Sequence, residues 1–196
     1  MSLKGQRTTT TSMDWDDFKS LIAKLERDGE YKFCLLIAVG VFTGLRISDL
    51  LHLRFSQFDD TDILTIQEKK TKKVRRIKIN SDLKEIVTRL KGKMGTVDSN
   101  QCMFINRYGT KPIDQSYVNV KLKEILKHYG IILEGNASSH LFRKTLGNRV
   151  LRLNNYSNEA VILLMDLFSH SSPAITRRYL GLREKEILDV YDSLRL

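Results

Sequence analysis

Residues 33–42, which read FCLLIAVGVF, are the longest apolar run of the chain and limit its fold more than any other segment. A membrane-spanning helix needs about 20 apolar residues, so this run is too short to cross a bilayer. A helix made of it is apolar on nearly every side and has to be buried all round. The run therefore predicts a central helix over 30–42, with the rest of a domain packed around it.

Lysine and arginine outnumber the acidic residues by 33 to 23, which gives the 196-residue chain a formal net charge of +10. This excess favours a polyanionic partner, either nucleic acid or an anionic membrane surface, and charge alone does not choose between them. The first 12 residues lack the apolar core of a signal peptide, so we expect a cytoplasmic protein. Cys34 and Cys102 lie far apart with no histidine at zinc-ligand spacing, which predicts neither a disulfide nor a metal site.

Hydrophobic periodicity and capping residues predict a mainly α-helical domain with one small antiparallel β-sheet, an α+β fold. A first helix is expected to begin after a cap at Ser12 and to end at the Asp28-Gly29 break. Further helices are expected over 45–54, 80–91, 114–130, 139–153, 158–168, a short segment after Pro173 and 184–194. Residues 1–12 are expected to form a flexible arm, and residues 13–196 the domain.

Residues 69–78, which read KKTKKVRRIK, are the most charged stretch of the protein. Apolar residues flank this tract on both sides, which predicts a hairpin with a strongly basic tip. Alternation along the strands would place apolar side chains on one face and cations on the other, within reach of a phosphate backbone. The alternative is a solvated edge that lysines protect from aggregation, and the tract alone does not separate the two.

Two histidines in the C-terminal half lie where they can bind an anion. His140 and Arg143 are three residues apart, so they share one face of a helix. Pro173 suits the first turn of a helix, and His170 lies just before it. Backbone N–H groups at that helix start would add to an anion-binding feature beside His170.

Tyr179 follows two helical turns later, beside Arg177 and Arg178. We expect these cations to lower the cost of ionising its hydroxyl. Each residue taken singly has a structural explanation, since a helical histidine is usually a satisfied structural residue and a tyrosine beside leucine usually packs. Their combination and order are more informative than any one of them.

These motifs resemble, in this order, the conserved boxes of the tyrosine recombinase (phage integrase) family. Residues 43–53 (TGLRISDLLHL) resemble the first box, residues 140–143 (HLFR) the second, and residues 169–179 the third. The resemblance runs from about residue 12 to the C-terminus. The catalytic residues that it implies are Arg46, Lys70, His140, Arg143, His170 and Tyr179.

The hairpin lysine is matched by its place before threonine, which favours Lys70, while Lys69 and Lys72 stay open because loop length shifts this position. Two positions depart from the family pattern: Ser169 stands where glycine is usual, and Lys144 where histidine is common. The serine is expected to alter the turn that presents the third-box histidine. Further DNA contacts are expected from Lys69, Lys72, Lys73, Arg75, Arg76, Arg177 and Arg178.

The resemblance implies cleavage and rejoining of double-stranded DNA through a 3′-phosphotyrosyl intermediate, without metal, cofactor or ATP. It also implies a monomer when free, a homo-tetramer on paired DNA sites and no membrane partner. Members generally carry an N-terminal DNA-clamp domain, which we expect this chain to lack. A type IB topoisomerase-like enzyme and a noncatalytic DNA-binding module are the alternatives.

The last predicted helix has an apolar stripe formed by Ile187, Val190, Tyr191 and Leu194. A segment this short needs an outside surface for its apolar face. The resemblance implies that it packs on a neighbouring protomer, and folding back onto its own domain is an equally favoured alternative.

Overall fold

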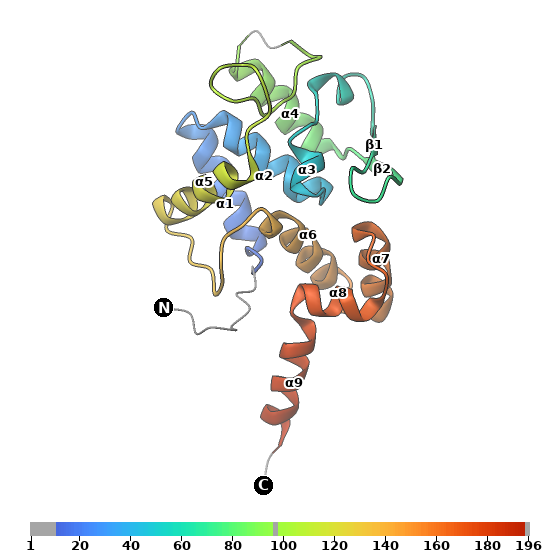
Figure 1. Ribbon diagram of the computed structural model, residues 1–196. Coiled ribbons are helices and arrows are strands. Elements are labelled where there is room, and N and C mark those ends of the chain that lie inside the picture. The colour runs from blue at the N-terminus through green and yellow to red at the C-terminus, as the bar shows by residue number, and fades with distance from the viewer. Residues whose placement is uncertain (1–10, 96–97, 195–196) are drawn as a thin grey trace.

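The computed structural model describes residues 11–95 and 98–194 and is shown in Figure 1. Its elements follow the chain as α1 (Trp15–Arg27), α2 (Tyr31–Thr43), α3 (Ile47–Leu50), η1 (Phe55–Gln57), β1 (Ile63–Gln67), β2 (Val74–Lys78), α4 (Ser81–Lys93), α5 (Gln115–His128), α6 (His140–Leu153), α7 (Asn158–Phe168), α8 (Pro173–Leu180) and α9 (Leu182–Ser193). The two strands pair antiparallel. The prediction of a mainly helical domain with one small sheet is confirmed. The arm expected over 1–12 lies for the most part outside the described residues.

Helix α2 is the centre of the main hydrophobic core. Every residue from 33 to 41 is buried, and α1, α4 and α6 pack against the helix. Gly40 lets α6 come close, because a Cβ at this position would lie 2.6 Å from the Phe142 ring. This arrangement confirms the central helix that the apolar run predicts.

A second, smaller apolar cluster lies between the end of α6, α7 and α8. Its buried members are Leu151, Ala160, Val161, Leu164, Phe168, Leu180 and Leu182. Beyond it, α9 leads away from the rest of the chain toward the C-terminus (Figure 1). Val190 and Tyr191 on α9 and Leu194 at its C-terminal cap are exposed. The side chain of Ile187, the fourth member of the predicted stripe, lies outside the described residues.

The β1–β2 hairpin pairs Leu64 with Ile77 and, nearest the turn, Gln67 with Val74. Leu64 and Ile77 are buried, as the alternation of apolar residues predicts. The expected division into an apolar and a cationic face is wrong for β2, because Val74 is 68% exposed while Arg75 is half-buried. The Arg75 guanidinium turns inward to satisfy acceptors of the neighbouring elements instead.

Two local predictions differ from the structure. The helix expected over 45–54 is limited to α3, because the Leu53 carbonyl accepts a hydrogen bond from the Met103 N–H at 2.8 Å and the chain continues as an extended bridge. The cap of α1 is Asp14, whose carboxylate accepts the Asp16 N–H at 3.1 Å, whereas Ser12 bonds to Asn148. In both cases a contact with a distant segment replaces the local preference.

Gly44 makes the turn that joins α2 to α3 and so places Arg46. It ends α2 in the left-handed region with φ +58°, where a side chain is strained. A Cβ at Gly44 would also lie 2.6 Å from Leu146 Cδ2 on α6. The glycine of the first box is therefore favoured by its backbone angle, and a side chain there would also displace the Leu146 methyl.

We expect Gly44→Ala to lower the free energy of unfolding by about 2 to 4 kcal/mol, since left-handed strain and overpacking add. Gly29→Ala is the matched control, because Gly29 has φ +80° but no atom within 4 Å of its Cβ position. Gly29→Ala should lower the free energy of unfolding by about 1 kcal/mol, from backbone strain alone. Urea denaturation measures both, and equal losses would contradict a role for the Leu146 contact.

Candidate active site

Five of the six residues expected to be catalytic meet where α3, α6 and α8 converge with the end of α7. Arg46 and Arg143 each donate from Nη2 to the carbonyl of Phe168 at 3.1 Å. His140 Nδ1 lies 3.3 Å from the Tyr179 hydroxyl, and the ring centroids of His170 and Tyr179 are 5.2 Å apart. Side chains from four separate segments of the chain therefore share one site.

The turn after α7 presents His170. Ser169 adopts the left-handed region with φ 52°, the conformation that favours glycine. The His170 N–H then donates to the Met165 carbonyl at 2.9 Å. His170 Nδ1 lies 3.0 Å from the buried Thr176 hydroxyl, which fixes the ring. The serine at this position therefore still makes the turn that glycine favours.

A third guanidinium, that of Arg75, belongs to this cluster. Its Nη2 donates to the Thr43 carbonyl at 2.8 Å, and burial lowers its pKa to about 10, with the charges of Arg143 and Arg46 contributing. Among the described residues, the buried Nη1 atoms of Arg75 and Arg143 have no hydrogen-bond acceptor, whereas that of Arg46 lies 2.8 Å from Glu68 Oε2. Buried donors are rarely left in this state, so the cluster is suited to an anion.

Glu68 and Asp49 are site residues that the sequence analysis missed. Glu68 is fully buried, with Oε2 2.8 Å from Arg46 Nη1. Burial raises the pKa of Glu68, but the hydrogen bond from Thr71 and the Arg46 charge outweigh it, and its pKa is lowered overall. Asp49 is buried on α3 and accepts the Lys69 N–H at 2.9 Å. The sequence contains one signal for Glu68, which is the sole acidic residue between positions 63 and 81.

The hydroxyl of Tyr179 is harder to ionise than the sequence predicts. Burial raises its pKa, and the charges of Arg143 and Arg46 offset this only in part. Lys144 is a buried residue, and its ammonium lies 5.2 Å from the centroid of the Tyr179 ring. The cations that favour ionisation of Tyr179 are thus Arg46 and Arg143 rather than the expected Arg177 and Arg178. Burial outweighs their effect on its pKa.

Both site histidines are neutral near pH 7. Burial and the nearby charges of Arg143 and Arg46 lower the pKa of His170 to about 4. Partial desolvation of the ring, together with Arg143 and Lys144, lowers the pKa of His140. His140 is therefore able to accept a proton, and His170 to donate a hydrogen bond from one nitrogen.

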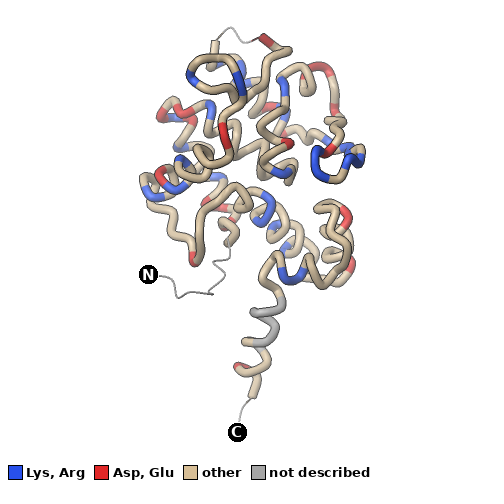
Figure 2. Tube along the Cα trace, in the orientation of Figure 1, with Lys and Arg blue, Asp and Glu red and all other residues tan. Residues whose placement is uncertain are grey.

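Lys70 lies apart from these five residues. It is exposed in the turn between β1 and β2, and no hydrogen bond or ion pair of its side chain occurs in the described part of the chain. The exposed cations Lys69, Lys72, Lys73 and Arg76 surround it, and Figure 2 shows blue Lys and Arg positions concentrated on this hairpin.

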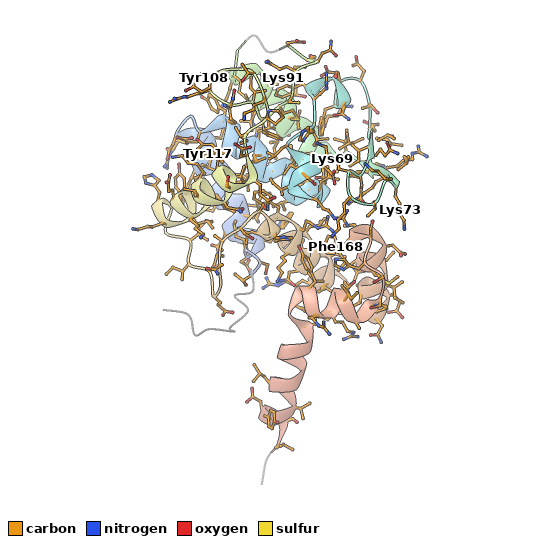
Figure 3. All side chains as sticks on the ribbon, in the orientation of Figure 1. Lys69, Lys73, Lys91, Tyr108, Tyr117 and Phe168 are labelled. Atoms are coloured by element: carbon orange, nitrogen blue, oxygen red, sulfur yellow. The ribbon has the colours of Figure 1, made fainter. Side chains whose placement is uncertain are left out.

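The hairpin faces the turn after α7 across a pocket of about 590 Å³. Lys73, Arg75 and Arg76 line one side of this pocket, and Ser169 and His170 the other. Figure 3 labels Lys69 and Lys73 on the hairpin and Phe168 at the end of α7 below them. The basic hairpin therefore borders the arginine cluster directly.

Other expected DNA contacts lie outside this hairpin. Arg178 is exposed on α8, and Arg177 on the same helix donates to Asn158. Within residues 11–95 and 98–194, no cluster of three His, Cys, Asp or Glu side chains has a geometry that could hold a metal ion. No helix in those ranges is both long and apolar enough to span a membrane.

The fold and the site together define a class. A family model described as Phage integrase family matches residues 11–186. The chain belongs to this family and is a tyrosine recombinase catalytic domain, the part of such enzymes that cleaves and rejoins DNA.

Particular relatives agree with this assignment. The probable integrase/recombinase YoeC of Bacillus subtilis (strain 168) is 32% identical over 149 residues, which cover 76% of this chain and 77% of YoeC. A post-cleavage complex of the XerH site-specific recombinase with a palindromic difH substrate shares the fold, with a TM-score of 0.66 and 17% identity over 93% of this chain and 53% of that one. A lambda integrase dimer bound to a COC′ core site has a TM-score of 0.66 and 18% identity over 90% of this chain and 49% of that one. The chain thus spans about half the length of these two solved proteins.

We expect an NMR titration of the DNA-free protein to show the His170 ring neutral down to about pH 4. Because the unfolded chain takes up this proton near 6.5, the stability that His170 contributes is complete above that pH and is lost as the pH falls toward 4. His170→Gln, which also identifies the signal, should make unfolding less sensitive to acid over this range. A His170 titration near 6.5 would contradict the desolvated site.

Proposed function

We propose that Tyr179 of this catalytic domain attacks the scissile phosphate of a double-stranded DNA site and forms a 3′-phosphotyrosyl link. One observation carries the proposal: the Tyr179 hydroxyl lies 3.3 Å from His140 Nδ1, beside two guanidiniums that share the Phe168 carbonyl. A nucleophile, a base and paired anion donors thus occupy one site.

In the cleavage step, the Tyr179 oxygen bonds to phosphorus and the bond between phosphorus and the 5′-oxygen breaks. The phenol proton passes to His140, and the 5′-oxygen takes a proton from Lys70. The products are a 3′-phosphotyrosine and a free 5′-hydroxyl. Rejoining reverses each transfer and returns the proton to Tyr179. One phosphate ester replaces another, so the reaction needs neither ATP nor a redox cofactor.

The arginine cluster stabilises the transition state. Charge accumulates on the non-bridging oxygens during the displacement, and Arg46 and Arg143 can each offer N–H donors to them. His170 adds a further donor. The raised pKa of Tyr179 makes His140 necessary, because the phenol stays protonated at neutral pH until a base removes its proton.

Lys70 is proposed as the general acid, with Lys69 and Lys72 as alternatives in the same turn. Its exposure leaves it free to reach DNA laid across the site. Lys69, Lys72, Lys73 and Arg76 would bind phosphates beside it, and Arg177 and Arg178 would do so from α8. Arg75 is proposed to support the anion site from within.

We propose that residues 13–196 form the catalytic unit, that it is monomeric when free and that four copies assemble on two paired DNA sites. Support comes from α9, whose exposed Val190, Tyr191 and Leu194 point to an outside surface such as a neighbouring protomer. The folded-back alternative would bury these residues. Because its substrate is DNA, we place the enzyme in the cytoplasm.

We expect Tyr179→Phe to abolish covalent attachment to a nicked duplex that contains the site while DNA binding stays nearly unchanged, because only the nucleophilic oxygen is lost. Denaturing electrophoresis detects the covalent band, and a binding assay reports retention. Tyr191→Phe, on the exposed α9, is the control and should still form the band. A band with Tyr179→Phe would assign the nucleophile to another residue, and binding without any band in the natural protein would indicate a noncatalytic module.

We expect Lys70→Ala to slow cleavage of an ordinary strand by about a hundredfold or more, as loss of a general acid does. A strand with sulfur in place of the scissile 5′-oxygen should restore the rate, because a thiolate leaves without a proton. Gel-resolved cleavage rates measure both. Rescue of Lys69→Ala or Lys72→Ala instead would move the role to that lysine.

A further inference from the structure

The carboxylate of Glu68 is the least expected group in the basic hairpin. It is completely buried, although four of the six residues that follow it are lysines. Its nearest charged neighbours are cations. Burying a carboxylate is costly unless ion pairs and hydrogen bonds compensate for lost hydration. The contacts that compensate at Glu68 all come from residues of the proposed active site or next to them.

One oxygen, Oε2, makes most of these contacts. Arg46 Nη1 lies 2.8 Å from it, the Thr71 hydroxyl donates to it at 2.6 Å, and the Ser169 hydroxyl donates to it at 3.3 Å. Arg75 Nη1 lies 3.7 Å from the other oxygen, Oε1. A single side chain therefore joins α3, the hairpin turn and the turn that presents His170.

The same residue also closes the turn that carries Lys70. The Lys72 N–H donates to the Glu68 carbonyl at 2.9 Å, and the Glu68 N–H donates to the Lys73 carbonyl at 2.9 Å. Lys69 is held on the other side, because its N–H donates to Asp49 at 2.9 Å. Both neighbours of Lys70 are thus fixed to the site, while its own side chain is exposed.

We propose that Glu68 is a positioning residue that holds the Lys70 turn against Arg46, so that the backbone of the lysine is already in place and its side chain within reach of the leaving oxygen when DNA binds. The inference rests on the proposed function, in which Lys70 protonates the 5′-oxygen. Glu68 does not touch the reacting atoms. Arg46 anchors the Glu68 carboxylate, and Glu68 in turn holds the hairpin turn through Thr71.

Two variants test the contacts of Glu68 with Arg46 and with Thr71, and a third is the control. Glu68→Gln keeps the shape and removes the charge, whereas Thr71→Val removes the hydroxyl that binds Glu68 and leaves the ion pair with Arg46 in place. Glu85→Gln is the matched control, because Glu85 pairs with Arg89 at 2.6 Å but is exposed and remote from the site. Thermal unfolding of each variant verifies that it is folded before any rate is compared.

The first measurement needs no DNA and no activity. Hydrogen exchange of residues 68–73 should become about tenfold faster in Glu68→Gln and in Thr71→Val, because the turn loses a tether. Glu85→Gln should leave this exchange unchanged. Unchanged exchange in folded Glu68→Gln would overturn the proposal, whatever the chemistry of Lys70.

The second measurement compares strands with oxygen and with sulfur at the scissile 5′-position. We expect Glu68→Gln and Thr71→Val to cleave the oxygen strand about tenfold more slowly and the sulfur strand within about threefold of the natural protein, since only the step that needs Lys70 is affected. Equal losses on both strands would show that Glu68 acts on the arginines alone and would overturn the proposal.

Lys70→Ala is measured in parallel so that the two proposals fail differently. If sulfur does not rescue Lys70→Ala but exchange in the turn still rises, the acid role of Lys70 is wrong and the positioning role of Glu68 stands. If sulfur rescues Lys70→Ala but not Glu68→Gln, the acid role stands and the positioning role is wrong.

Discussion

The Phe168 carbonyl is the acceptor on which the assembled site depends. The last carbonyls of a helix have no partner within it and carry the negative end of the helix dipole, so they bind cations well. Phe168 ends α7, and its carbonyl accepts from both Arg46 and Arg143 at 3.1 Å. Because Arg46 follows the central α2 while Phe168 belongs to the second apolar cluster, this acceptor ties the two cores together. The two guanidiniums are thereby held side by side without DNA.

Holding cations this close requires that their mutual repulsion be compensated. The site does this with buried carboxylates and with a histidine that adds no further positive charge. Glu68 pairs with Arg46 and lies near Arg75, and Asp49 holds the adjoining hairpin turn at Lys69. Burial, together with the charges of Arg143 and Arg46, lowers the pKa of His170 to about 4 and keeps its ring neutral. Burial nevertheless raises the pKa of Tyr179, so its nucleophilic oxygen is protected as a phenol until a base removes the proton. Desolvation of the site therefore keeps the His170 ring neutral and also keeps the Tyr179 phenol protonated.

The sequence predicted the parts of the fold that depend on local pattern and on motif order. The central helix, the hairpin and the helix expected over 80–91, whose cap Asn80 accepts the Leu83 N–H at 2.9 Å, follow from such patterns. Arg46 and Tyr179 were found by their motifs and do meet. Glu68 and the inward turn of Arg75 were missed, because both depend on which residues of distant segments face the hairpin. A lone acid within a run of lysines looks like charge balance on a surface until the fold buries it.

The contrast between the buried arginines and the exposed Lys70 has an electrostatic reason. Three guanidiniums already share the space around Glu68, and a free ammonium brought beside them would be repelled and desolvated at once. A scissile phosphate changes this balance, because its negative charge makes a fourth cation favourable at the same place. The turn therefore holds the backbone of Lys70 at both neighbours and leaves its flexible side chain in water. The arginines are therefore fixed without DNA, because Glu68 compensates their charge. The Lys70 side chain takes its place only when the phosphate of DNA is present.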